Sequence, residues 1–182
     1  MKKLTILLGT VAMLGFFTSC EDMDVDITVK SKYYDHDLVI PPAPQGEYID
    51  VTQMNQADVA EMLEEAGQEK DATVNKIYVD DVQLNIDRNS AIEDFTAVDD
   101  FYAIFDSENV GQDTVAATHN RGAASTKLTL DVYKKDIKKY FDEEEFNYKV
   151  AGVLNQELTD TLKVKVRIRF EVIVDGGDLQ QY

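Results

Sequence analysis

Few residues of this chain have the types and spacings that perform chemistry. The chain holds one cysteine, Cys20, and two histidines, His36 and His119, which lie far apart and in no HExxH zinc motif. Its nine glycines form neither a GxGxxG nor a GxxxxGKS/T phosphate loop, and no GxSxG nucleophile elbow is present. A surface or turn position is the simplest interpretation of each histidine. We therefore expect a protein that is not an enzyme and that needs no cofactor.

Cys20 follows a segment with the layout of an export signal. Lys2 and Lys3 make the amino-terminal end positive, and a mostly apolar run extends from Leu4 to Phe17. A helix that spans a bilayer needs about 20 apolar residues, so this run is too short for a permanent membrane span. An ordinary secretory signal cut before Cys20 is the alternative. Its peptidase favours small residues at both recognition positions, and Phe17 occupies the first of them.

The segment Phe17-Thr18-Ser19-Cys20 resembles the lipidation motif of bacterial lipoproteins, in which a leucine, a small residue and Gly, Ala or Ser precede the cysteine. Phe17 and Thr18 depart from that motif in a way that is familiar in lipoproteins of the Bacteroidota. The resemblance implies a signal peptide over residues 1–19 and acyl chains such as palmitate on Cys20. Two or more acyl chains anchor a protein stably. The expected protein is therefore an outer-membrane lipoprotein of the cell envelope, and its body is similar to small β-rich lipoproteins of no assigned activity.

Three acidic residues directly follow the lipidated position: Glu21, Asp22 and Asp24. They resemble the acidic export signal of Bacteroidota lipoproteins that are displayed on the outer face of the outer membrane, which implies exposure at the cell surface. The alternative is a solvated tether that is acidic because the whole chain is acidic. In either case we expect residues 20–24 to form a lipidated tether and residues 25–182 to form one domain.

The net charge of the chain restricts its partners. The formal charge is −17, and loss of the two lysines of the signal peptide, which contains no acid, leaves −19. Such a charge opposes binding to nucleic acid and to anionic membrane surfaces. The apolar fraction of 44% is typical of a globular domain. We therefore expect a folded domain whose partners are the membrane, through lipid on Cys20, and a protein or a glycan, but no nucleic acid.

The segment 106–113 invites comparison with a calcium loop. Asp106, Glu108 and Gly111 match the first, third and sixth positions of an EF-hand loop, and Asp113 adds a further carboxylate. The twelfth position is Ala117 rather than the bidentate glutamate that such a loop requires. A polar hairpin turn is therefore the simpler interpretation. We expect no metal, with Asp106, Glu108 and Asp113 as the residues of a weak alternative calcium site.

Four basic residues alternate with apolar ones near the carboxyl end: Lys163, Lys165, Arg167 and Arg169. On a strand they would share one face. One interpretation is a docking surface for an anionic glycan, a lipid head group or an acidic partner. The other, which we favour, is a solvated sheet face with cross-strand ion pairs to neighbouring aspartates and glutamates.

The elements that position these residues are mostly strands. Strict alternation over Leu162–Val174 predicts a long strand with one face in the core. Shorter alternating segments are found around residues 25–29, 77–86, 102–104, 128–132 and 146–150, and around Val115 after the 106–113 turn. The alternation slips at Asp80-Asp81, which predicts a bulge or a turn. About seven or eight strands predict a single antiparallel β-sandwich, immunoglobulin-like or jelly-roll-like.

Two short helices and one rigid connection complete the prediction. Apolar residues at helical spacing predict one helix over Met54–Ala66, with Asn55 as its cap, and a second over Tyr133–Phe141. All three prolines lie in residues 39–46, which predicts an extended crossing after the first strand.

The expected function is that of a non-enzymatic, membrane-anchored binding or assembly module. A glycan-binding accessory module is one alternative. Sugars stack on exposed aromatic faces, and the chain has nine tyrosines but no tryptophan. Three coplanar exposed tyrosines would favour this alternative. A pilus-type subunit is another, and Leu162–Val174 could then be the strand that one subunit donates to the next.

Overall fold

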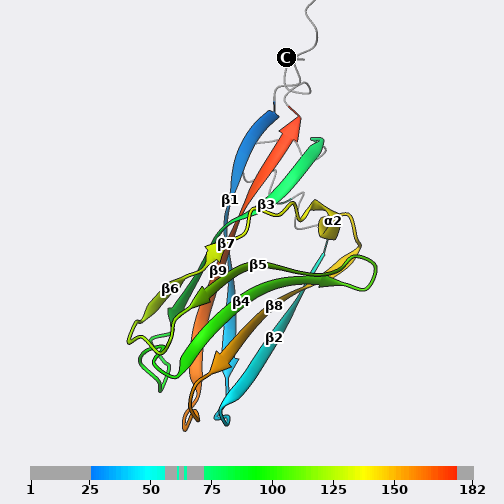
Figure 1. Ribbon diagram of the computed structural model, residues 1–182. Helices are drawn as coiled ribbons and strands as arrows, with labels where there is room; N and C mark the ends of the chain where they lie inside the picture. Colours follow the sequence, from blue (N-terminus) through cyan, green and yellow to red (C-terminus); the bar gives the residue numbers. More distant parts are fainter. Residues whose placement is uncertain (1–25, 56–60, 62–63, 65–71, 176–182) are drawn as a thin grey trace, which may run out of the picture.

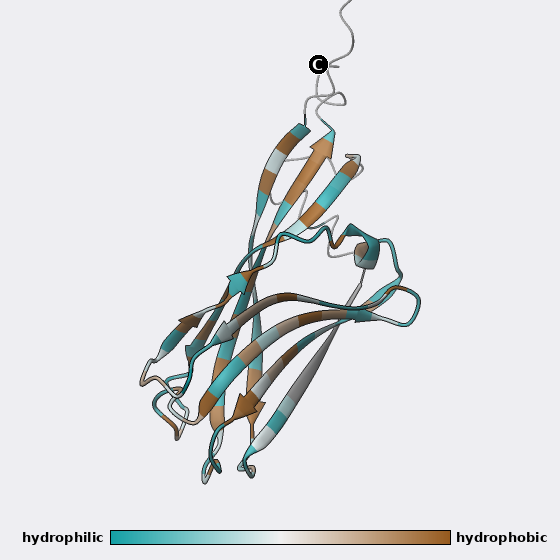
Figure 2. Ribbon diagram, viewed as in Figure 1, coloured by the Kyte–Doolittle hydropathy of each residue, from teal (hydrophilic) through white to brown (hydrophobic). Residues whose placement is uncertain are grey.

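The computed structural model describes residues 26–55, 61, 64 and 72–175. Two antiparallel sheets pack against each other as a sandwich (Figure 1). The strand order is β1-β9-β3-β6 in the four-stranded sheet and β2-β8-β4-β5-β7 in the five-stranded sheet. Apolar and polar residues alternate along the strands (Figure 2). The predicted sandwich is confirmed.

The described part of the chain contains nine strands, one short helix and two further helical residues, Glu61 and Glu64. They are β1 (Asp26–Ile40), β2 (Gly46–Asn55), β3 (Val74–Ile86), β4 (Val98–Ser107), β5 (Gly111–His119), β6 (Lys127–Thr129), β7 (Asp131–Val132), α2 (Lys138–Phe141), β8 (Glu145–Leu154) and β9 (Leu162–Asp175). The strand number exceeds the predicted seven or eight because β2 was not expected and residues 128–132 divide into two strands.

Strand β9 is the central element of the four-stranded sheet. Its even-numbered side chains are buried and its odd-numbered ones are partly exposed, as the alternation predicts. It pairs with β1 on one edge and with β3 on the other.

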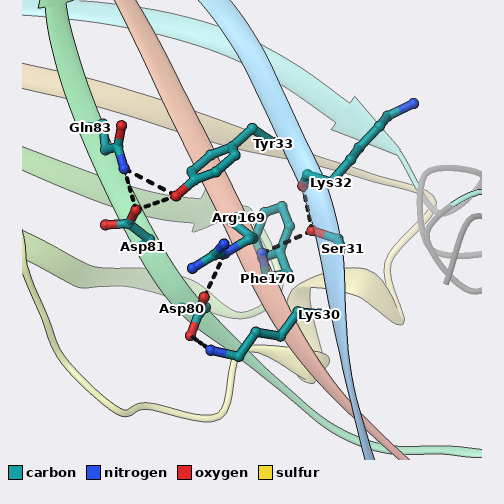
Figure 3. A network of polar contacts seen from close by, with 9 residues as sticks. All are labelled: Lys30, Ser31, Lys32, Tyr33, Asp80, Asp81, Gln83, Arg169 and Phe170. Carbon is teal, nitrogen blue, oxygen red and sulfur yellow. Dashed lines mark hydrogen bonds and ion pairs between the residues drawn. The ribbon is translucent and has the colours of Figure 1, made fainter.

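Both neighbours of β9 contain a bulge. The predicted slip in β3 is a register shift between Val79 and Asp81. A second shift, which was not predicted, lies between Lys30 and Tyr33 of β1. There the Phe170 N–H donates to the Ser31 hydroxyl oxygen at 3.0 Å, as Figure 3 shows. The bulge leaves the Phe170 N–H without a backbone acceptor on β1, and the Ser31 hydroxyl accepts its hydrogen bond instead.

The core is centred on Phe105 of β4, whose side chain is 0% exposed. Its ring centroid lies 5.5–6.2 Å from those of five other aromatic residues: Tyr140, Phe141, Phe146, Tyr148 and Phe170. Phe170 belongs to β9 and the others to α2 and β8, so this ring joins the helix and both sheets. Such aromatic pairs stabilise the core beyond their buried area.

The connections between the sheets differ in part from the prediction. The proline segment does lead from β1 in one sheet to β2 in the other, and on the way Ala43 forms a backbone bridge with Leu158. The single strand expected over residues 128–132 is divided. Its first half, β6, pairs with β3, whereas β7 pairs with β5 of the other sheet. The chain passes from the first sheet to the second at Leu130, which is 3% exposed.

The helix predictions are confirmed in part. Only Lys138–Phe141 of the predicted segment 133–141 is helical, because the preceding backbone binds to strands: the Tyr133 N–H donates to the Val115 carbonyl and the Ile137 N–H to the Ile77 carbonyl. The other prediction began at Met54, but β2 extends to Asn55. Glu61 and Glu64 are helical, and the remaining residues of that segment lie outside the described residues.

Gly122 is required in the turn after β5. Its φ of +69° lies in the left-handed region, and a Cβ there would be 2.9 Å from Asn155 Nδ2 and 3.0 Å from the Thr96 carbonyl oxygen. We expect Gly122→Ala to lower the free energy of unfolding by about 1–3 kcal/mol in urea denaturation. Gly111 (φ +86°) is the matched control, because a Cβ there meets nothing within 4 Å. Equal losses for the two variants would contradict the steric part of this prediction.

Candidate functional site

The outward side of β1, β9 and β3 carries charges of both signs and includes the four basic residues found in the sequence. We call it the charged face. It consists of Lys30, Tyr33, Asp35, Asp37, Asp80, Asp81, Gln83, Asn85, Lys163, Lys165, Arg167 and Arg169. Its two ends differ in how their cations are bound.

Towards the start of β1, the cations are fully engaged. Arg169 Nε and Lys30 Nζ each lie 2.6 Å from an oxygen of the Asp80 carboxylate (Figure 3). This side chain is only 12% exposed. Burial by itself raises the pKa of Asp80, but hydrogen bonds from Lys30 and Arg169 outweigh it and hold the pKa below its usual 3.8. The bulge in β3 thus places the Asp80 carboxylate where it binds cations of both β9 and β1, which lie on the same side of β3.

Tyr33 closes this network across three strands. The guanidinium carbons of Arg167 and Arg169 lie 4.3 and 4.8 Å from the centroid of its ring, which are cation–π distances. The Tyr33 hydroxyl donates to Asp81 at 2.5 Å, and Gln83 donates to the same carboxylate at 2.6 Å. The hydrogen bond to Asp81 raises the pKa of Tyr33 above 10.0. These contacts hold β1, β9 and β3 in register.

Towards the end of β1, the cations are weakly engaged. Asp35 binds Arg167 Nε at 3.1 Å, and Lys165 Nζ lies 3.8 Å from the other oxygen of the same carboxylate. Lys163 makes no ion pair with any residue that the structure describes. The expected cross-strand ion pairs are therefore present for the arginines, loose for Lys165 and missing for Lys163.

The fold brings a further lysine beside these two. Lys127 on β6 is paired with Asn85 on β3, and Asn85 is paired with Lys165 on β9. Strands lie about 4.8 Å apart, so Lys127 and Lys165 belong to one cross-strand row about 10 Å wide. Lys127 forms no ion pair within the described part of the chain. Its position depends on pairing between distant segments, so no local pattern could reveal it.

Arg88 completes the group. The Asp87 N–H donates to the Lys163 carbonyl oxygen at 2.9 Å, which places the start of the β3–β4 loop beside β9. Arg88 follows directly, is exposed, and forms no ion pair among the described residues. We call Arg88, Lys127, Lys163 and Lys165 the basic corner. It adjoins a shallow, open pocket of about 250 Å³ lined by Ile86, Asp87, Arg88, Ser90, Glu93 and Thr126.

The hairpin carboxylates do not gather into a metal site. Residues 108–110 form the turn between β4 and β5, within the predicted segment 106–113, whose outer residues belong to the two strands. Asp106 binds Lys149 at 2.7 Å, whereas Asp113 binds Lys139 at 2.6 Å, and the hydrogen bond from Lys139 lowers the pKa of Asp113. Glu108 is exposed. No group of three potential metal ligands occurs among the residues described.

The remaining candidates lie apart from the charged face. His36 belongs to β1 and His119 to β5 of the other sheet, where its Nδ1 lies 2.5 Å from Asp100 Oδ1, so the histidines form no common site. Of the described tyrosines only Tyr133, at 42%, is strongly exposed, so the three-tyrosine platform is not found there. Cys20, Glu21, Asp22 and Asp24 lie outside the described residues.

No family model matches this chain, and a search of curated proteins gave no match. In the described part of the chain, no helix has the length and apolar character to cross a membrane.

Proposed function

We propose that this protein is a non-enzymatic lipoprotein of the outer membrane that serves as a binding module at the cell envelope. The layout of residues 1–20 supports lipidation at Cys20. The acidic residues Glu21, Asp22 and Asp24 support display at the cell surface. The single sandwich supplies a rigid body that such an anchor would hold.

The start of β1 at Asp26, six residues after Cys20 in the sequence, is the observation that carries this proposal. Strand β1 begins at Asp26, and the intervening residues reach at most about 20 Å. The Asp26↔Asp175 pair therefore marks the end of the sandwich nearest to the lipid, and the Ile40↔Leu162 pair marks the far end. The 15 residues of β1 span about 50 Å.

Four loops gather at the far end of the sandwich (Figure 1). They are the connections 41–45, 87–97, 120–126 and 155–161. Backbone hydrogen bonds join three of them, from the Asn155 N–H to the Ala97 carbonyl and from the Phe95 N–H to the Ser125 carbonyl. A lipid at Cys20 would hold the opposite end at the membrane and present these loops to a partner. Loops on a rigid scaffold are the usual location of binding residues.

The anchor is tested by Cys20→Ala in the full chain, expressed in a bacterium that processes lipoproteins. We expect the wild type to remain with membranes after a high-salt wash and the variant to appear in the soluble fraction, because loss of the thiol removes the site of acylation. Thr18→Ala, which keeps Cys20, is the matched control and should stay with the membrane. Membrane retention of Cys20→Ala, or absence of an acyl mass on wild-type Cys20, would contradict the proposal.

A further inference from the structure

We infer that the outer face of the five-stranded sheet docks a partner protein, which contributes apolar side chains bordered by lysine or arginine. This inference deepens the proposed function, on which it rests, because it names the surface and the partner class of the binding module. The basic corner of the other sheet selects no ligand, since its cations are balanced by Asp35, Asp37, Asp87 and Glu93.

An apolar strip crosses the outward side of β8, β4 and β5. The odd-numbered residues of β8 point outward, and residues directly paired across strands share their face. We call apolar strip the six outward residues Tyr102, Ile104, Ala117, Tyr133, Ala151 and Val153. None of them belongs to the hydrophobic core or packs against it. The solvent side of an antiparallel sheet is ordinarily polar, so a continuous apolar surface there indicates an interaction site.

Ala117 forms the floor of the strip between two tyrosines. Its partner on β4 is Tyr102, and its partner on β7 is Asp131. Tyr133 follows two residues after Asp131, where backbone pairing to β5 continues, and is 42% exposed. Burial raises the pKa of Tyr102 above 10.0, and Tyr133 adds to this rise, so the two hydroxyls lie near each other. The rings offer apolar contacts and also cation–π contacts to lysine or arginine.

Carboxylates border the strip. Glu47 on β2 and Asp100 on β4 are the two cross-strand partners of Val153, and Asp131 lies at the other end of the strip beside Ala117. Glu47 and Asp131 are exposed and form no ion pair with any residue that the structure describes. The border therefore offers two carboxylates that are open to the cations of a partner.

The charge balance of this face selects the partner. Lys149 is bound to Asp106 at 2.7 Å. Lys135 and Lys139 share Asp113 and so add one positive charge, which does not reverse the acidic excess. A partner with cations beside its apolar residues is attracted, and an acidic one is repelled. The carboxylates on and around this face are Glu47, Asp99, Asp100, Asp106 and Asp131, and the lysines and arginines are Arg121, Lys134 and Lys149.

The same features disfavour other occupants. A second copy stacked on this face about a two-fold axis would place its carboxylates against those of the first. A glycan stacks on exposed aromatic rings, but the strip contains the aliphatic side chains of Ile104 and Val153 and only one strongly exposed ring, that of Tyr133. An apolar centre with a charged border is instead the anatomy of a protein–protein interface.

The acidic border is tested by titration calorimetry of the full-length protein in mild detergent with a short peptide of alternating lysine and leucine. We expect saturable binding that weakens as salt rises. Glu47→Gln/Asp131→Asn should bind about tenfold more weakly because two charge-assisted contacts are lost. Glu93→Gln/Glu144→Gln is the matched control and should bind like the wild type. Both of its residues are exposed, lie outside the five-stranded sheet and lack an ion pair in the described part of the chain.

The apolar strip is tested separately with the same peptide. Tyr133→Ala should weaken binding about threefold, because one cation–π and apolar contact is lost. Val39→Ala is the control and should leave binding unchanged. Val39 is also strongly exposed, at 47%, but lies on β1 of the other sheet. A peptide of alternating lysine and serine should bind the wild type more weakly, because it has no apolar side chains.

Four outcomes would overturn the inference. Equal weakening in both double variants would show a general charge effect, and equal binding of the lysine–serine peptide would exclude a role of the strip. Displacement of the peptide by neutral pullulan would indicate a glycan. A dimer that Tyr133→Ala dissociates in sedimentation would indicate a second copy. Membrane fractionation of Cys20→Ala tests the anchor and the titration tests the strip, so each proposal can fail without the other.

Discussion

Replacement of Phe105 by alanine is expected to lower the free energy of unfolding by about 3–5 kcal/mol. The ring is 0% exposed and lies within 6.2 Å of the five aromatic rings that surround it. Removal of the ring would leave a cavity where the two sheets and α2 meet. The surrounding side chains cannot fill this cavity unless several elements move, so most of the packing energy is lost. Urea denaturation, followed by circular dichroism because the chain has no tryptophan, measures the loss.

Tyr133→Ala is the control for this prediction. It also removes a large aromatic side chain, but one that is 42% exposed, so its cost should stay below about 1 kcal/mol. A Phe105→Ala loss no greater than that of Tyr133→Ala would mean that the aromatic cluster is not the centre of the core.

Loss of the Asp80 carboxylate should have the second largest effect. In Asp80→Ala, Lys30 and Arg169 keep their charges without the acceptor that each binds at 2.6 Å. We expect a loss of about 2 kcal/mol in urea, because a carboxylate 12% exposed is shielded from water more than a surface group is. Asp142→Ala is the matched control. Asp142 is 58% exposed and pairs with Lys138 within one helical turn, which is worth about 0.5 kcal/mol or less.

The ion pairs of Asp80 with Lys30 and Arg169 also set the direction in which the stability of the fold depends on pH. The folded pKa of Asp80 lies below its ordinary value of 3.8. The folded state therefore holds fewer protons at this site than the unfolded state, and the stabilisation is present above pH 3.8 and is lost as the pH falls through the folded pKa. Wild-type stability should decline more steeply on acidification than that of Asp80→Asn. Parallel declines would exclude a contribution from Asp80.

The parts of the fold that were predicted correctly have local causes. Strict alternation over Leu162–Val174 allows only one face to be buried, and the result is β9. The slip at Asp80-Asp81 was visible because apolar residues flank it closely. The equivalent bulge in β1 was missed because Tyr33, Tyr34 and His36 follow it, and these residues carry no clear preference for the core. Asp80, in contrast, could not be assigned Lys30 and Arg169 as partners without the strand order.

The candidate site was predicted only in part for the same reason. The four basic residues on β9 were identified, because their spacing of two is a property of one strand. Arg167 and Arg169 are engaged in close ion pairs, whereas Lys163 and Lys165 are not. This difference could not be predicted because it depends on Asp35, Asp80 and Lys127, which come from three other strands. Residues 128–132 illustrate the limit: a regular alternation was interpreted as one strand, but the pairing partners place its halves in different sheets.

The pairing of the two terminal strands also has a mechanical consequence. If the protein is anchored through Cys20 as proposed, a partner held at the far end pulls β1 along its own axis. Hydrogen bonds between antiparallel strands run perpendicular to the strands, so this load would be shared across the β1–β9 ladder from Asp26↔Asp175 to Ile40↔Leu162 instead of opening it one bond at a time. The domain would therefore resist tension in the direction in which an anchored binding module is pulled.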